Sequence, residues 1–226
     1  MKVALFTDTY FPQVNGIATC VEILADHLKA KGHEVIIFAP KIKASKSDKS
    51  QNVIRINSVK VFPHLDELRL PIILQDSLKE INDFKFDIVH AHGNALFSLL
   101  GYFSAKRRGV PFVLTFHMFM EDYTHYLYAG KKIGDPIVKR IYRFYANLCD
   151  AIVAPSVKMQ KTLVANGVKK EITVIPNFIE LSKFSQKDDG FIQEYLGLDR
   201  SAPVLLFVGR VSKEKNVRFL VKAFFE

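Results

Sequence analysis

The sequence predicts an α/β fold with a doubly wound parallel sheet of the Rossmann-like class. Short apolar runs of strand length alternate along the chain with longer segments whose apolar residues recur at helical spacing. Strands that alternate with helices form βαβ units, and the crossovers make neighbouring strands parallel. The runs are continuously apolar, which predicts that both faces of the sheet are covered.

The amino-terminal elements follow in order from the first residues. Residues 3–6 form an apolar run that predicts the first strand. A helix starts near Ile17, because apolar residues recur from there every three or four positions. Strands are expected at residues 34–38 and 53–56, and the Ser- and Lys-rich segment 43–52 between them is expected to be a mobile loop.

The middle of the chain continues this alternation. Helices are expected at residues 72–81 and 95–107. Buried strands, the last two separated by another helix, are expected at residues 87–90, 111–116, 151–154 and 172–175.

One further helix is predicted to open at Asp135-Pro136, with Asp as the N-cap and Pro in the first turn. Its predicted apolar face consists of Ile137, Ile141, Phe144 and Leu148. The basic residues opposite that face are Lys139, Arg140 and Arg143. A basic amphipathic helix of this kind can lie on anionic lipid, and the alternative is an ordinary helix with a solvated face.

The composition changes after residue 175, which predicts a domain boundary. A turn and a polar segment lead to a new apolar run, residues 203–208, and to a helix near Asn216. We therefore expect a Rossmann-like domain over residues 1–180, a linker over 181–201 and the truncated start of a second nucleotide-binding domain over 202–226. One strand and one helix cannot bury their own apolar faces, so the alternative is that this last segment docks on the first domain.

Composition limits the partners and the compartment. The formal net charge of +9 favours an anionic partner, and no nucleic-acid-binding motif accompanies the scattered basic residues. No apolar run is long enough to cross a bilayer, and the apolar stretch at the amino terminus is too short for a signal peptide. Cys20 and Cys149 occupy unrelated segments, so we expect no disulfide framework and a cytoplasmic protein.

The loop between the first strand and the first helix, residues 7–16, is a candidate ligand site. In a doubly wound sheet, ligands bind beyond the carboxyl ends of the strands. Gly16 stands at the start of a helix, where backbone N–H groups and the helix dipole favour a phosphate. The alternative is an ordinary Asn-Gly turn at Asn15.

Histidines gather at the ends of two predicted strands. His90 and His92 can share one face of a strand because they are two residues apart, and His117 ends another strand. With Asp122 and His125 these residues either rim a cleft or, if three of them converge, hold a metal. We expect no metal here, because no Cys accompanies them in sequence and no helical His spacing is present.

Two other segments have the composition of binding loops. Residues 115–128 are crowded with aromatic, Met and His side chains, which serve binding in an exposed loop and packing in a buried one. Residues 209–215 follow a predicted strand and precede a helix. There Arg210 offers a bidentate fork and Lys215 a point charge, which suits a diphosphate.

Taken together, these segments resemble retaining family 4 glycosyltransferases of the GT-B architecture. The resemblance covers essentially the whole chain in order, and its combination of motifs is specific although each motif alone is weak. The matching motifs are residues 12–16, 87–92, 115–117, 154–156, 174–177 and 209–215.

The resemblance implies a retaining transfer of a hexose from a nucleotide diphosphate sugar, with a UDP-sugar favoured and no cofactor or metal required. It implies that His117 is the catalytic residue beside the donor sugar. Asn15 and Gly16 accommodate the donor phosphates, and Arg210 and Lys215 neutralise the diphosphate leaving group. Residues 1–180 then form the acceptor side. The family's pair of Glu residues would follow residue 226, so we expect the chain to be inactive by itself.

The acceptor is implied at the level of a subfamily. The segment after Thr115 to His117 is similar to that of bacterial diacylglycerol glucosyltransferases, which implies a membrane lipid acceptor and a peripheral position on the inner face of the membrane. The alternatives are a soluble polysaccharide or metabolite acceptor, or a non-enzymatic module that binds sugars or anions. The residues assigned to the acceptor or membrane are Asp122, Tyr123, His125, Tyr126, Lys139, Arg140 and Arg143.

Overall fold

The computed structural model divides the chain into two compact units, Met1–Ile179 and Glu180–Glu226, and each is described by itself. The residues that the structure describes are 1–42, 52–62, 65–72, 75–93, 96–117, 119, 131–181, 185, 190–209, 211 and 215–225. The predicted loop at residues 43–52 lies outside them except for its last residue, Asn52.

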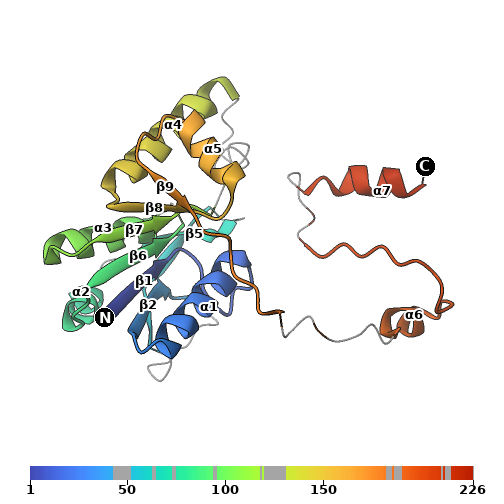
Figure 1. Cartoon of the computed structure of the whole chain (residues 1–226), viewed down its shortest axis with the longest axis horizontal. Coiled ribbons are helices and arrows are strands. Elements are labelled where there is room, and N and C mark those ends of the chain that lie inside the picture. The colour runs from blue at the N-terminus through green and yellow to red at the C-terminus, as the bar shows by residue number, and fades with distance from the viewer. Residues whose placement is uncertain are drawn as a thin grey trace. The chain divides into compact units, whose positions relative to one another are not determined.

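The first unit is built on a seven-stranded sheet in which all neighbouring strands are parallel (Figure 1). Its strand order is β3-β2-β1-β6-β7-β8-β9, so the chain first winds outward in one direction and then in the other. This arrangement confirms the doubly wound α/β prediction. The strands are β1 (Lys2–Thr7), β2 (Glu34–Pro40), β3 (Val53–Ile56), β6 (Ile88–His92), β7 (Phe112–Thr115), β8 (Ala151–Ala154) and β9 (Ile172–Val174).

Two hydrophobic cores lie on opposite faces of this sheet. One core joins α1 to alternate residues of the first two strands, such as Leu5 and Ile37. The other core joins the remaining helices to the intervening residues, such as Phe6 and Phe38, whose rings stack at 4.5 Å. The helices are α1 (Gly16–Ala30), α2 (Gln75–Asp83), α3 (Leu96–Arg108), α4 (Lys131–Leu148) and α5 (Val157–Ala165).

Coverage of the two faces differs between the middle and the far edge of the sheet. Residues Val3 to Phe6 are all buried, as the sequence predicts. In β8, however, Ile152 is buried whereas Ala151 is exposed and Val153 only partly buried. The prediction that both faces are covered is therefore wrong for β8. The physical reason is that α1, which covers one face, packs against β1 and β2, and these strands lie toward the opposite end of the strand order from β8.

Helix α4 differs from its prediction in two ways. It begins at Lys131, and Pro136 lies inside it rather than in the first turn. A proline inside a helix lacks the N–H that would bond to the carbonyl four residues earlier, so this turn has one hydrogen bond fewer. The buried stripe is also rotated: Val138, Tyr142 and Tyr145 face the core, whereas Ile137 and Phe144 are 43% and 50% exposed. Tyrosine rings supply the larger apolar surface, so they occupy the buried side.

A hairpin was not predicted. Strands β4 (Ser58–Phe62) and β5 (Leu65–Pro71) pair antiparallel in a separate sheet. Arg69 reaches across it, with Nε donating to Ser58 Oγ at 2.8 Å and Nη2 donating to Ser58 O at 3.0 Å. Because β5 extends to Pro71, helix α2 begins three residues later than predicted.

The second unit contains the helices α6 (Phe191–Leu196) and α7 (Val217–Phe225). The helix predicted near Asn216 is confirmed, and α6 was not predicted. Residues 203–208 do not form the predicted strand, and Leu205 and Leu206 are 73% and 70% exposed. An apolar run becomes a strand only when another strand satisfies its N–H and C=O groups, and the described residues of this unit include none.

Candidate functional site

The carboxyl edge of the sheet brings the candidate residues together. Thr7 of β1 is in register with His92 of β6, which is in register with Thr115 of β7. The strand order reverses between β1 and β6, and a doubly wound sheet has its ligand crevice at such a point.

The loop between β1 and α1 is held by hydrogen bonds of Asn15. Its Oδ1 accepts from the N–H groups of Ile17 and Ala18 at 3.1 and 3.0 Å, and its Nδ2 donates to Thr9 Oγ1 at 2.8 Å. Asn15 is thus the N-cap of α1. A Cβ added to Gly16 would meet no atom within 4 Å. The helix start is therefore fixed in place and faces open space, as a phosphate site requires.

The buried carboxylate of Asp8 connects this loop to α3. Its Oδ1 accepts from the backbone N–H of Phe97 at 3.0 Å, in the first turn of that helix, where a negative charge is favoured. A Cβ on Gly93 would lie 2.3 Å from Asp8 Oδ2, and Gly93 has φ +105°. Glycine at this position is required twice over, by the close approach and by the backbone conformation. No individual role was predicted for Asp8.

Arg55 braces the same loop from β3. Its Nη1 donates to Pro40 O at 3.4 Å, its Nη2 donates to Phe11 O, and its guanidinium lies 5.3 Å from the centre of the Tyr10 ring. Burial, reinforced by Glu22, raises the pKa of Tyr10 to about 12, so the phenol stays neutral. Arg55 was missed because its partners are backbone carbonyls, which leave no pattern in the sequence.

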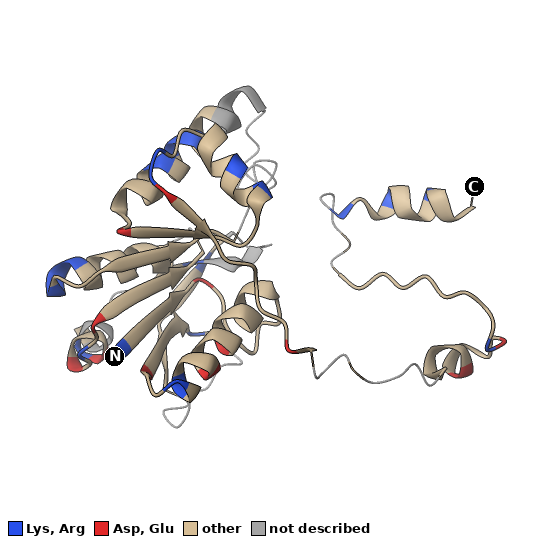
Figure 2. Cartoon of the chain, viewed as in Figure 1, with Lys and Arg blue, Asp and Glu red and all other residues tan. Residues whose placement is uncertain are grey.

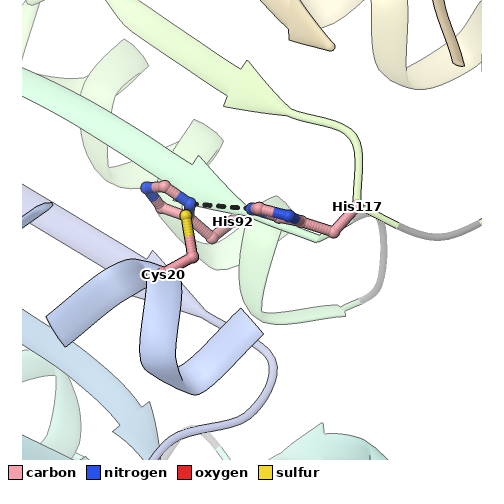
Figure 3. A group of neighbouring side chains, drawn as sticks. All are labelled: Cys20, His92 and His117. Carbon is pink, nitrogen blue, oxygen red and sulfur yellow. Dashed lines mark hydrogen bonds between the residues drawn. The ribbon is translucent and has the colours of Figure 1, made fainter. Parts of the chain in front are cut away.

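The three histidines do converge. Nδ1 of His92 lies 3.0 Å from Nε2 of His117, as Figure 3 shows, and Nε2 of His90 lies 2.8 Å from Thr115 Oγ1. Burial lowers the pKa of His90 and of His117 to about 4, and it lowers that of His92 well below its usual value, with a contribution from His90. All three imidazoles are therefore neutral at physiological pH and can exchange hydrogen bonds.

Cys20 joins this cluster from α1. One ligand atom each of Cys20, His92 and His117 lies within 4.8 Å of the others. The Cys20 thiol donates to Asn177 Oδ1 at 3.6 Å, which brings the segment after β9 against α1. Cys20 was not predicted as a site residue. It was missed because its contacts depend on how α1 lies across the sheet, which the sequence pattern does not record.

The remaining predicted site residues are on helix surfaces or outside the described residues. Lys139, Arg140 and Arg143 are exposed on α4 of the first unit, and Lys215 is exposed just before α7 of the second. The predicted residues that lie outside the described part of the chain are Asp122, Tyr123, His125, Tyr126 and Arg210.

A family model described as Glycosyltransferase Family 4 matches residues 14–183, which is most of the chain. The chain belongs to glycosyltransferase family 4. This confirms the family predicted from the motifs.

Curated relatives agree with this family assignment. The chain is 34% identical over 99% of its length to an alpha-monoglucosyldiacylglycerol synthase of Streptococcus pneumoniae, and 29% identical over its whole length to one of Acholeplasma laidlawii. It spans 52% and 60% of these relatives, so about half the length of the proteins it matches.

Solved structures confirm the GT-B fold of this glycosyltransferase chain. A sucrose-phosphate synthase from Thermosynechococcus elongatus superposes with a TM-score of 0.69 at 19% identity, over 99% of this chain and 59% of that one. The catalytic domain of starch synthase IV from Arabidopsis thaliana superposes with a TM-score of 0.57 at 16% identity, over 99% and 65%.

Proposed function

We propose that the full-length protein transfers a hexose from a nucleotide diphosphate sugar to a membrane lipid hydroxyl, such as that of diacylglycerol, with retention of anomeric configuration. The observation that carries this proposal is the 34% identity, over 99% of the chain, to an alpha-monoglucosyldiacylglycerol synthase. The second relative with that name supports it.

The donor phosphates are assigned to the start of α1. Asn15 orients this helix end, and Gly16 leaves space in front of it, so a phosphate can approach the backbone and the positive end of the helix dipole. Arg210 and Lys215 are assigned to the diphosphate leaving group. They would stabilise the charge that develops on the leaving group, without a required metal.

His117 is assigned to the donor sugar. Its Nε2 faces His92, so Nδ1 is the atom we assign to a sugar hydroxyl. Because the pKa of His117 is lowered to about 4, the imidazole is neutral and adds no positive charge beside the sugar. Its role is then to orient the reacting carbon through hydrogen bonding, with His92 fixing the ring.

The membrane surface is assigned to the exposed side of α4. Basic residues follow one another along α4 and α5 in Figure 2, and Ile137 and Phe144 are exposed beside Arg140. Basic groups that flank exposed apolar side chains suit an anionic bilayer. Among the described helices, none is long and apolar enough to span a membrane. We assign the protein a peripheral position on the inner face of the membrane.

A GDP-sugar is the second candidate donor. A GDP-mannose-dependent alpha-mannosyltransferase of Mycobacterium tuberculosis is 25% identical over 96% of the chain and is covered over 58% of its own length. A UDP-sugar remains the first candidate, because the more similar relatives are glucosyl lipid synthases.

The experiment that tests this proposal is a product assay on the full-length protein. It is incubated with a panel of UDP- and GDP-sugars, with and without diacylglycerol in anionic liposomes, and products are identified by mass spectrometry and by the anomeric NMR coupling. We expect an α-hexosyl lipid from one donor. Transfer only to soluble acceptors would contradict the lipid assignment, and a β-linked product from an α-donor would contradict retention.

A further inference from the structure

The side chains of Cys20, His92 and His117 form a compact group at the carboxyl edge of the sheet (Figure 3). They come from three segments that are distant in sequence: Cys20 from the second turn of α1, His92 from the end of β6 and His117 from the loop after β7. The fold therefore brings one thiol and two imidazoles close together, although no short sequence motif contains all three residues.

The geometry of this group is close to that of a tetrahedral metal site. With metal–nitrogen bonds of about 2.0 Å and a metal–sulfur bond of about 2.3 Å, neighbouring ligand atoms are about 3.3 to 3.6 Å apart. Here the two imidazole nitrogens are 3.0 Å apart, and the three ligand atoms are within 4.8 Å of one another. Small side-chain rotations would bring all three to coordination distance.

Burial and tautomer freedom also favour an ion at this position. His92 is 1% exposed and its Nε2 has no hydrogen-bond partner among the described residues. The 3.0 Å contact between its Nδ1 and Nε2 of His117 is possible in either tautomer, so Nδ1 can present a lone pair. Because Nε2 of His92 has no described partner, the ring lacks the outer hydrogen bond that usually orients a metal-ligating histidine. We therefore expect reversible binding rather than a structural site.

We propose that Cys20, His92 and His117 bind a sulfur- and nitrogen-preferring divalent cation of the Zn²⁺ type. Binding converts the Cys20 thiol to a metal thiolate and releases one proton to solvent. The two imidazoles remain neutral, and a water molecule completes the fourth position. The proposed ion is not a catalytic cofactor, because the proposed hexose transfer requires no metal.

The consequence for catalysis rests on the proposed function. An ion on Nε2 of His117 would hold that ring as the tautomer protonated on Nδ1, so it could only donate a hydrogen bond to the donor sugar. Ion binding itself does not depend on this role, so it can be measured without turnover.

Co²⁺ titration of the metal-free 226-residue chain, followed by absorbance, tests the proposal. We expect a one-to-one complex with a thiolate-to-cobalt charge-transfer band in the near ultraviolet, which excess Zn²⁺ abolishes. Cys20→Ser should remove the band and lower the affinity by more than about a hundredfold, because losing only an outer partner costs roughly 10- to 100-fold. His117→Gln, which alters the more accessible ligand, should also weaken binding.

Cys149→Ala is the matched control, because Cys149 is the other cysteine and lies outside the group. It should leave the band unchanged, and circular dichroism confirms that each variant is folded. A folded wild-type chain without the band, or a band that survives Cys20→Ser, overturns the proposal. Neither result would affect the transferase proposal.

Discussion

Two strand–turn–helix segments of this chain have the same sequence pattern and different structures. In the first, residues of β1 such as Leu5 and Phe6 are fully buried and α1 packs against the sheet. In the second, residues 203–208 are extended without strand pairing, and Leu205 is 73% exposed. Both segments are apolar runs followed by a turn and a helix, with Gly16 as the first residue of α1 and Gly209 directly after residues 203–208.

The difference shows that this pattern is sufficient to specify a helix, whereas a strand also requires neighbouring strands to pair with. A helix satisfies its own backbone groups, so α7 forms at the predicted place. A strand needs neighbours, and β1 has β2 on one side and β6 on the other. The strands that would pair with residues 203–208 are not among the described residues of the second unit.

A matched pair of leucine substitutions tests whether the two segments differ in packing. Leu5→Ala should lower the free energy of unfolding of the 226-residue chain by roughly 2–5 kcal/mol, because it leaves a cavity in a packed core. Leu205→Ala should change it by less than about 0.5 kcal/mol, as is usual for exposed positions. Urea unfolding followed by circular dichroism measures both, and equal effects would contradict the account.

The pH dependence of the unfolding free energy reports on the packing of the first unit, because the buried histidines all belong to it. Folded His90 and His117 have pKa values lowered to about 4 from 6.5, so the unfolded chain binds more protons between those values. Stability should therefore be complete above about pH 6.5 and fall as the pH drops towards 4, by a few kcal/mol in total.

The matched variant for this measurement is His90→Gln, which removes one of the titrating groups. It should flatten the decline in unfolding free energy between pH 6.5 and pH 4.5. A wild-type curve that is level over this range, or a variant curve as steep as the wild type, would mean that the histidines are protonated in the folded state.

The glycine of the first turn provides a smaller effect on ligand binding. Gly16→Ala should leave the free energy of unfolding within about 1 kcal/mol, because a Cβ there meets no atom. In the full-length protein it should weaken donor binding by about tenfold, or about 1.4 kcal/mol, if the phosphates occupy that space. Calorimetric titration with the donor identified in the product assay measures this, and unchanged affinity would exclude Gly16 from the phosphate site.

The smallest effects are expected at the surface of α4. Arg140→Gln and Arg143→Gln should each weaken binding of the full-length protein to anionic vesicles by about 1 kcal/mol, roughly fivefold. Lys106→Gln and Arg107→Gln, at the end of α3, serve as controls of equal charge and should have less effect. Co-sedimentation with vesicles measures all four, and equal losses at both helices would mean that net charge, rather than α4, determines binding.

The sequence predicted the sheet closely because each buried strand is a continuous apolar run. All seven parallel strands were predicted to within two residues at each end, and Val53–Ile56 and Ala151–Ala154 were predicted without error. The hairpin at Ser58–Pro71 was missed because its mixed composition does not distinguish short paired strands from a loop. The rotation of α4 was missed because tyrosines were not counted as core residues.

The site was predicted in part. His117, Asn15 and Gly16 could be chosen because they follow strand ends or begin a helix, which sequence order shows. Cys20 and Arg55 could not, because their contacts depend on how α1 and β3 lie across the sheet. Distances of that kind arise from packing between segments far apart in the chain, and the sequence pattern carries no record of them.

Initial rates of hexose transfer by His117→Ala and His27→Ala variants of the full-length protein test whether the carboxyl edge of the sheet is the catalytic site. His117 lies at the carboxyl edge of the sheet, whereas His27 is exposed in the last turn of α1. With the donor found in the product assay, we expect His117→Ala to lose about a hundredfold in rate, the size of effect that follows from misplacing a reacting group, and His27→Ala to match the wild type. A folded His117→Ala variant within about twofold of the wild-type rate would contradict the assignment of this edge as the catalytic site.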